Sequence, residues 1–164
     1  MIIGIPKELK DQESRVAAVP GAVADLVKNG IEVLVEAGAG IGSGITDDDY
    51  AEAGAKVLDS AADVWQKSDI IYKVKEPLKE EYKYLREDLI IYAYLHLAGN
   101  EELLDELIKN KVTAIGFETV IKDKKLPLLR PMSEIAGRMA VQEGARYLTK
   151  PEGAGASSSK ACQE

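Results

Sequence analysis

The sequence predicts an α/β fold: a Rossmann-like (flavodoxin-like), mostly parallel sheet with flanking helices, followed by a long interdomain helix. Short apolar runs of strand length alternate with segments in which apolar residues recur at helical spacing, and this alternation is typical of βαβ units. The chain has 164 residues, of which 46% are hydrophobic and 30% are charged. It is therefore long enough for one sizeable core and polar enough for a globular protein.

The first half of the chain contains three predicted strands and three predicted helix starts. Apolar runs predict strands at residues 2–5, 31–35 and 69–74. Pro20 suits the first position of a helix, and Gly30 suits its end. The spacing of a capping box occurs twice, at Thr46 with Asp49 and at Ser60 with Asp63.

The second half continues the same alternation. The run LIIYAYL at residues 89–95 is nearly continuously apolar, so we expect a strand buried on both faces of the sheet. Asn100 is placed to cap a helix, and residues 112–117 form the next apolar run. Residues 133–148 predict a long helix whose small side chains permit close packing.

Composition excludes several classes of function. The formal net charge of −7 argues against nucleic acid or an anionic membrane as a partner, because both require basic patches. The apolar run at the amino terminus is too short for a signal peptide or a membrane span. A single cysteine allows neither a disulfide framework nor a thiolate metal site. We expect a cytoplasmic protein without a metal.

Ionisable side chains follow the predicted strands where each strand ends. Lys75, His96 and Glu118 come directly after three of them, and Arg15 lies in the loop after the first strand. Sites in open parallel sheets lie at the carboxyl ends of the strands. Each residue also has a structural interpretation: His96 as a hydrogen-bonding side chain, Lys75 and Arg15 as solvated charges, and Glu118 as a cap or ion-pair partner.

Taken together, these residue types favour a small acid as ligand. Arginine suits two-pronged capture of a carboxylate, lysine can polarise a carbonyl, and histidine can move protons near neutral pH. The combination of Arg15, Lys75 and His96 therefore predicts a site for a small 2-oxo or 2-amino acid.

The glycine-rich segment at residues 38–44, GAGIGSG, resembles a dinucleotide-binding loop but lacks its spacing. The third glycine of G-x-G-x-x-G is replaced by Ser43 when counted from Gly38, and by Ile45 when counted from Gly40. No helix begins on the glycines either. We expect a flexible turn here and no nucleotide site.

Six stretches of the sequence carry a resemblance to a known family. They are GIPKELKDQESRVAAVP at 4–20, EAGAGIGSGITDDDYAEAGA at 36–55, KVKEPLKEEY at 73–82, LHLAGN at 95–100, FETV at 117–120 and LPLLRPMSEIAGRMAVQEGARYL at 126–148. From residue 1 to about residue 152 the chain resembles the alanine dehydrogenases almost continuously. Proton-translocating transhydrogenases share the opening stretch and the GAG turn, but they are less similar around LHLAGN and PMSEIAGR.

The resemblance implies the reversible, NAD-dependent oxidative deamination of L-alanine to pyruvate and ammonia. It implies two Rossmann-like domains with the active site in the cleft between them, and a homo-oligomer, expected to be a hexamer. Arg15 and Lys75 would hold the carboxylate and carbonyl of the substrate, and His96 would transfer protons, which makes Lys75 and His96 the catalytic residues. Met132 would contact the substrate, and Ser133 the cofactor.

The resemblance also implies a domain organisation. Residues 1–130 would form the substrate domain, 131–149 an interdomain helix, and 150–164 a disordered tail. Within codon degeneracy, the tail from Gly153 can be read one base out of register as the glycine-rich connection expected before an NAD domain. We therefore expect a frameshift-truncated fragment that is inactive alone. The alternatives are a non-catalytic module that binds pyruvate or alanine or joins oligomers, and a fragment of a transhydrogenase subunit.

Overall fold

The computed structural model describes residues 1–149, so the prediction for residues 150–164 lies outside the described residues. The chain divides into two compact units, Met1–Thr119 and a second that begins at Val120. The first unit contains the whole sheet, and the second contains the long helix. The predicted domain bounds, 1–130 and 131–149, stay a prediction.

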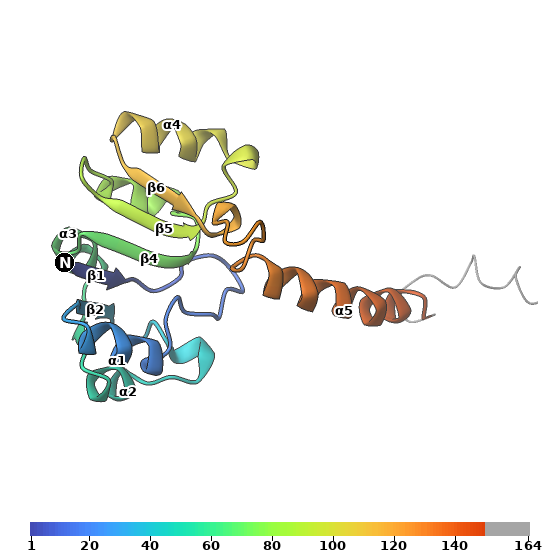
Figure 1. The fold of residues 1–164 in the computed structure, drawn as a ribbon, viewed down its shortest axis with the longest axis horizontal. Helices are drawn as coiled ribbons and strands as arrows, with labels where there is room; N and C mark the ends of the chain where they lie inside the picture. Colours follow the sequence, from blue (N-terminus) through green and yellow to red (C-terminus); the bar gives the residue numbers. More distant parts are fainter. Residues whose placement is uncertain (150–164) are drawn as a thin grey trace, which may run out of the picture. The chain divides into compact units, whose positions relative to one another are not determined.

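All six strands of the first unit pair in parallel, and the arrows of β1, β4, β5 and β6 point the same way in Figure 1. The strands are β1 (Ile2–Ile5), β2 (Glu32–Glu36), β3 (Lys56–Leu58), β4 (Ile70–Lys75), β5 (Ile90–Tyr94) and β6 (Thr113–Gly116). Their order across the sheet is β3-β2-β1-β4-β5-β6, which is the order of Rossmann sheets. The predicted Rossmann-like α/β class is confirmed.

The strand order reverses between β1 and β4. The chain builds outwards from β1 through β2 to β3, then crosses to β4 on the other side of β1. β1 and β4 are in register only at Ile3 with Ile70 and at Gly4 with Ile71. A reversal of strand order of this kind marks the place where open α/β sheets bind their ligands.

Helices cover the two faces of the sheet unequally. On one face lie α1 (Pro20–Lys28) and α2 (Asp47–Glu52), whose Val23 and Tyr50 join a core with β1 and β2. On the other lie α3 (Ala61–Lys67) and α4 (Glu101–Lys109), which share a core with β4 and β5 (Figure 1). The predicted capping box of Thr46 and Asp49 is complete, and Asn100 accepts from the Leu103 N–H. Of the box predicted at Ser60 and Asp63, only the bond from the Asp63 N–H to Ser60 forms.

The prediction that residues 89–95 are buried on both faces is wrong. Ile91, Ala93 and Leu95 are buried, but Ile90, Tyr92 and Tyr94 on the opposite face are only partly buried. Within Met1–Thr119, both helices of that face, α1 and α2, pack over the β1–β2–β3 half of the sheet. The rings of Tyr92 and Tyr94 pack instead on Phe117, with centroids 4.3 and 4.9 Å away.

The second unit consists mainly of α5 (Arg130–Tyr147). This helix begins three residues before the predicted start at Ser133, because Pro131 suits a first turn, where its missing N–H is not needed. Before it, Lys122 and Lys125 close a short antiparallel turn. Within residues 1–149, no helix combines the length and apolar character that crossing a membrane requires.

Candidate functional site

Three of the predicted side chains belong to the carboxyl edge of the sheet. Lys75 is the last residue of β4 and is in register with Tyr94 of β5. His96 follows β5 by two residues, and Arg15 lies in the loop after β1. The topology thus brings groups far apart in sequence to the place where β1 and β4 separate.

Arg15 is held by its near neighbour Glu13. The Arg15 Nε and Nη2 atoms donate to the two carboxylate oxygens of Glu13 at 2.8 and 2.6 Å, and the Arg15 backbone N–H donates to the same carboxylate at 3.0 Å. These hydrogen bonds lower the pKa of Glu13, and the nearby Lys75 ammonium contributes to the lowering. The bond with Glu13 also raises the pKa of Arg15, with Tyr94 and Glu8 adding to the effect.

Lys75 presents an available ammonium group. Its side chain is partly buried, and within residues 1–149 it makes neither a hydrogen bond nor a salt bridge. Its charge nevertheless acts on Glu13, so Lys75 and Arg15 face the same small region. Tyr94, which the sequence did not single out, borders this region as the strand partner of Lys75.

Glu8 fixes the end of β4. The register between β4 and β5 shifts between Tyr72 and Lys75, and β1 has already parted from β4 there. The Glu8 carboxylate accepts the Val74 N–H at 2.7 Å and the Lys75 N–H at 3.4 Å. One loop side chain thus supplies acceptors that the neighbouring strands do not provide, and it positions the backbone that carries Lys75.

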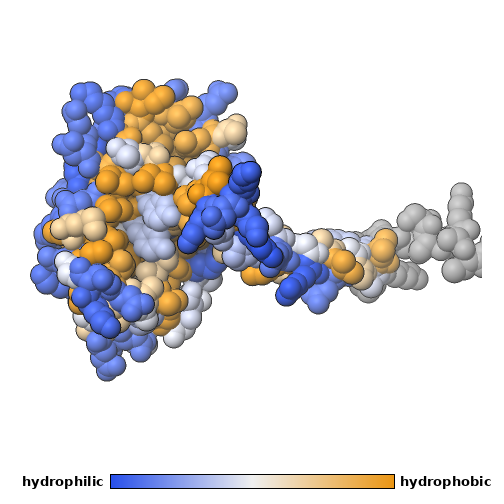
Figure 2. Space-filling model, viewed as in Figure 1, coloured by the Kyte–Doolittle hydropathy of each residue, from blue (hydrophilic) through white to orange (hydrophobic). Residues whose placement is uncertain are grey.

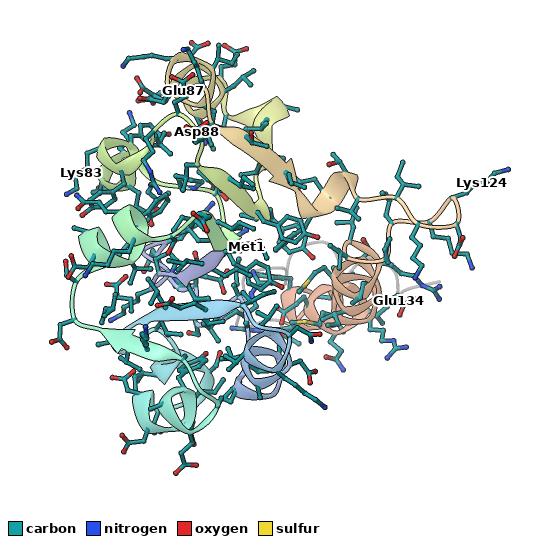
Figure 3. All side chains as sticks on the ribbon, turned by 60° about the vertical axis from the view of Figure 1, so that its left-hand side comes forward. Met1, Lys83, Glu87, Asp88, Lys124 and Glu134 are labelled. Carbon is teal, nitrogen blue, oxygen red and sulfur yellow. The ribbon has the colours of Figure 1, made fainter. Side chains whose placement is uncertain are left out.

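A buried lysine neutralises this carboxylate. Lys73, 1% exposed, forms a salt bridge of 2.6 Å with Glu81 and one of 3.7 Å with Glu8, and its ammonium lies 6.0 Å from the Trp65 ring. Burial raises the pKa of Glu8, while Lys73 and the two backbone donors oppose that rise. In contrast, the charged side chains of Lys83, Glu87 and Asp88 point outwards (Figure 3).

His96 has a left-handed backbone, with φ 47° and ψ 42°. Glu118 stabilises this conformation, because its carboxylate accepts the His96 N–H at 2.7 Å and the Leu95 N–H at 3.0 Å. The imidazole lies against Gly99: a Cβ on Gly99 would come within 2.7 Å of His96 Nε2. Within the described chain the imidazole makes no hydrogen bond, so both ring nitrogens are available to a ligand. His96 and Glu118 line an open hollow of about 320 Å³.

The glycine-rich turn supports the Arg15 loop. Residues Ile41–Ser43 form a single 3-10 turn, and the Ser43 hydroxyl donates to the Ser14 carbonyl at 2.8 Å. A Cβ on Gly42 would come within 2.9 Å of that same carbonyl oxygen, so only glycine allows this close approach. Residues 41–44 themselves stay exposed to solvent, so the contact fixes the Arg15 loop without covering the turn.

A buried side chain of α2 also holds the Arg15 loop in place. The Tyr50 hydroxyl, fully buried in α2, donates to the Ala18 carbonyl at 2.8 Å. Burial, together with Asp47 and Asp49, raises the pKa of Tyr50 to about 12. The same loop begins with Lys7, whose N–H donates to Glu36 at 2.9 Å. A rigid loop is what a binding arginine requires, since ordering it during binding would weaken affinity.

Met132 and Ser133 lie in α5, within the second unit. The Ser133 hydroxyl contacts the Leu129 carbonyl at 3.4 Å, and Met132 is partly exposed. Their predicted roles beside Arg15, Lys75 and His96 stay predictions. No group of three or more His, Cys, Asp or Glu side chains in residues 1–149 could hold a metal ion.

Comparisons with known proteins identify relatives over most of the chain. Residues 4–136 match the family model described as "Alanine dehydrogenase/PNT, N-terminal domain". An alanine dehydrogenase of Bacillus subtilis (strain 168) is 53% identical over 153 residues, which cover 93% of this chain and 40% of the relative. One from Methanococcus maripaludis is 51% identical over 154 residues, which cover 93% and 41%. The chain thus spans about 40% of the length of the curated relatives it matches.

Solved structures give a consistent result. A structure of an L-alanine dehydrogenase superposes with a TM-score of 0.86 at 48% identity, over 93% of this chain and 42% of that one. A transhydrogenase from Sinorhizobium meliloti superposes with a TM-score of 0.70 at 36% identity, over 74% of this chain and 35% of that one.

Proposed function

The chain belongs to the family of the alanine dehydrogenase/PNT N-terminal domain, and from this premise we propose that it carries the substrate site of an NAD-dependent alanine dehydrogenase. The observation that carries the proposal is the arrangement at the carboxyl edge of the sheet. Arg15 and Lys75 act on one small region, and His96, with both ring nitrogens available, follows the strand next to that of Lys75.

Each side chain suits one part of a 2-oxo acid such as pyruvate. The Arg15 guanidinium would bind the carboxylate through two parallel hydrogen bonds. The Lys75 ammonium would donate to the carbonyl oxygen and stabilise negative charge that develops there. His96 would take up and return the proton that the interconversion of amine and carbonyl requires, since an imidazole can do both near neutral pH.

Arg15, Lys75 and His96 would bind the substrate and not the cofactor. In the family reaction, NAD accepts the hydride from the amino acid. The glycine turn at residues 38–44 lacks the spacing of a dinucleotide-binding loop, so we do not assign the cofactor to it. Ser133 at the start of α5 is our candidate for a cofactor contact, and Met132 for a further substrate contact.

A transhydrogenase-type role is the second candidate, because relatives of that kind share this fold. The alanine dehydrogenase structure superposes more closely, over more of the chain and at higher identity, which favours the first proposal. The two roles differ in their expected ligand, since only the first requires a bound amino or oxo acid.

The test is a titration of the isotope-labelled 164-residue chain with pyruvate, followed by NMR. We expect the largest shifts at Arg15, Lys75 and His96. Arg15→Lys should weaken binding about tenfold, because a point charge cannot replace a two-pronged donor. Arg146→Lys, the same exchange in α5, should leave binding unchanged. If Arg15→Lys binds pyruvate as tightly as the wild-type chain does, this site is refuted.

A further inference from the structure

We propose that Glu13 is an internal competitor for the substrate: its carboxylate occupies the donors of Arg15 that would bind a substrate carboxylate, and the substrate must displace it. For pyruvate as ligand, this inference rests on the function proposed above. For carboxylates in general, it rests only on the geometry around Glu13.

The Glu13 carboxylate contacts Arg15 in the same way as a bound carboxylate ligand would. Both oxygens of the Glu13 carboxylate are engaged by the guanidinium, from Nε at 2.8 Å and from Nη2 at 2.6 Å. Arginine binds free carboxylates through the same two-pronged contact. A carboxylate arriving from solution therefore has to take the Arg15 donors that Glu13 now occupies.

The charges around Glu13 complete the site. Lys75 attracts this carboxylate in addition to Arg15, so both residues proposed to hold the substrate act on Glu13. The Glu13 side chain is only 8% exposed, whereas that of Arg15 is 45% exposed. Within residues 1–149, the Glu13 carboxylate accepts hydrogen bonds from no residue other than Arg15.

Displacement needs only a local movement. The backbone of the loop is fixed separately, because the Glu13 N–H donates to the Lys10 carbonyl at 3.1 Å and the Ser14 carbonyl accepts from Ser43. Rotation about the side-chain bonds of Glu13 is then sufficient to vacate the guanidinium without refolding the loop. An ion pair that is open to solvent on one side is weak enough to be replaced in this way.

Competition of this kind has a defined signature. Removing the competing charge should raise affinity for every carboxylate by the same factor, since the same pair is broken each time. Pyruvate keeps its advantage over a simple carboxylate, because Lys75 can also reach its carbonyl oxygen. Glu13 would therefore weaken the binding of simple acids and of pyruvate by the same factor and leave the ratio of their affinities unchanged.

The experiment compares the wild-type chain with Glu13→Gln, which preserves shape and removes the charge. Binding of acetate and of pyruvate is measured for each by NMR, through the Arg15 Nε–H signal. We expect both ligands to bind about twofold to fivefold more tightly to Glu13→Gln, by the same factor. The control is Glu32→Gln, which breaks the exposed Glu32–Lys56 pair at the start of β2, at the opposite edge of the sheet.

Each outcome decides between the two proposals. Unchanged or weaker binding of both acids by Glu13→Gln would overturn the inference and identify Glu13 as a residue that positions Arg15. If pyruvate binds the wild-type chain and Glu13→Gln with equal affinity, the proposed function stands and the inference is rejected. If acetate binds Glu13→Gln more tightly than the wild-type chain but pyruvate binds neither protein, the inference stands and the proposed function is rejected. If neither acid binds either protein, both proposals fail.

Discussion

The imidazole of His96 lies over Gly99, and this contact offers a way to move the ring without changing its chemistry. A methyl group at residue 99 would come within 2.7 Å of Nε2, so Gly99→Ala has to shift the ring. The test requires turnover, which can be measured in a chimera in which residues 1–149 replace the matching part of the Bacillus subtilis relative. Displacing a catalytic group by about 1 Å can reduce the rate by up to about 10²-fold.

We expect Gly99→Ala to lower kcat of the chimera about tenfold to a hundredfold, and His96→Ala to lower it about 10²- to 10⁴-fold, as for a general acid–base. Thermal unfolding of both variants should stay close to that of the parent chimera, because residues 96 and 99 are exposed. Full turnover in His96→Ala would show that the histidine is structural.

The Glu13–Arg15 pair predicts a specific dependence of stability on pH. Hydrogen bonds from Arg15 hold the pKa of Glu13 below its ordinary value of 4.5. An acid with a lowered pKa in the folded state contributes stability that is fully present above the ordinary value and is lost as pH falls through the lowered one. The wild-type chain should therefore lose more unfolding free energy than Glu13→Gln as pH falls from about 5 to about 3.

The measurement is urea unfolding of both proteins at several pH values across that range. Glu32→Gln serves as the comparison, since it removes a carboxylate of a solvent-exposed pair. If the curves of wild type and Glu13→Gln stay parallel throughout, the pair contributes nothing to stability.

Sequence patterns pointed to Arg15, Lys75 and His96 as candidates because each follows a recognisable strand, and their roles stay predictions. They did not reveal Glu13, Glu8 or Tyr94. A carboxylate in a charged loop has the same appearance in sequence whether it is solvated or bound to an arginine. Tyr94 became part of the site only through its register with Lys75, and register is a property of the paired strands.

At the scale of elements, the Arg15 loop depends on a hydrogen bond from helix α2. Tyr50 of α2 donates to the Ala18 carbonyl from a fully buried position. Tyr50→Phe keeps the ring and removes the donor, which leaves a buried carbonyl without this partner. We expect a loss of about 1–3 kcal/mol of unfolding free energy. Pyruvate affinity should also fall, because the loop that carries Arg15 is less ordered.

Tyr84→Phe is the matched control for this experiment. Its ring packs on Trp65, and its hydroxyl has no hydrogen-bond partner within residues 1–149. The exchange should alter stability by less than about 0.5 kcal/mol. Equal losses in the two variants would show that the Tyr50 bond does not matter.

The elements themselves followed from local chemistry: the capping residues and Pro20 marked helix starts, and apolar runs marked strands. The order of the strands could not be derived in this way. Whether β4 adds beside β1 or beside β3 depends on which surfaces the completed helices leave available, and no local pattern encodes that. The same limit explains the wrong expectation for residues 89–95, since the run is apolar on both faces but helices within Met1–Thr119 cover only one.

For the chain as a whole, that face of the sheet carries apolar side chains that no helix of Met1–Thr119 covers. Figure 2 shows hydrophobic and weakly polar side chains over the strands between α1 and β6. An open hollow of about 400 Å³ lies beside α1 over Ile70, Tyr72 and Tyr92. Ile115 of β6 is 42% exposed on the same face. Apolar patches of this kind promote association.

We therefore expect the 164-residue chain to self-associate through this face, with an apparent mass in light scattering that rises with concentration. Ile90→Thr combined with Ile115→Thr should reduce the association, because threonine keeps the branched Cβ that strands favour and adds a polar group. Thr113 already lies on this side of β6, two residues from Ile115. Ile108→Gln removes an exposed isoleucine from α4, outside the patch, and should leave the association unchanged. A wild-type chain that is monomeric at every concentration would contradict this expectation. If Ile108→Gln reduced the association as much as the double substitution, association would not depend on the uncovered face of β4, β5 and β6.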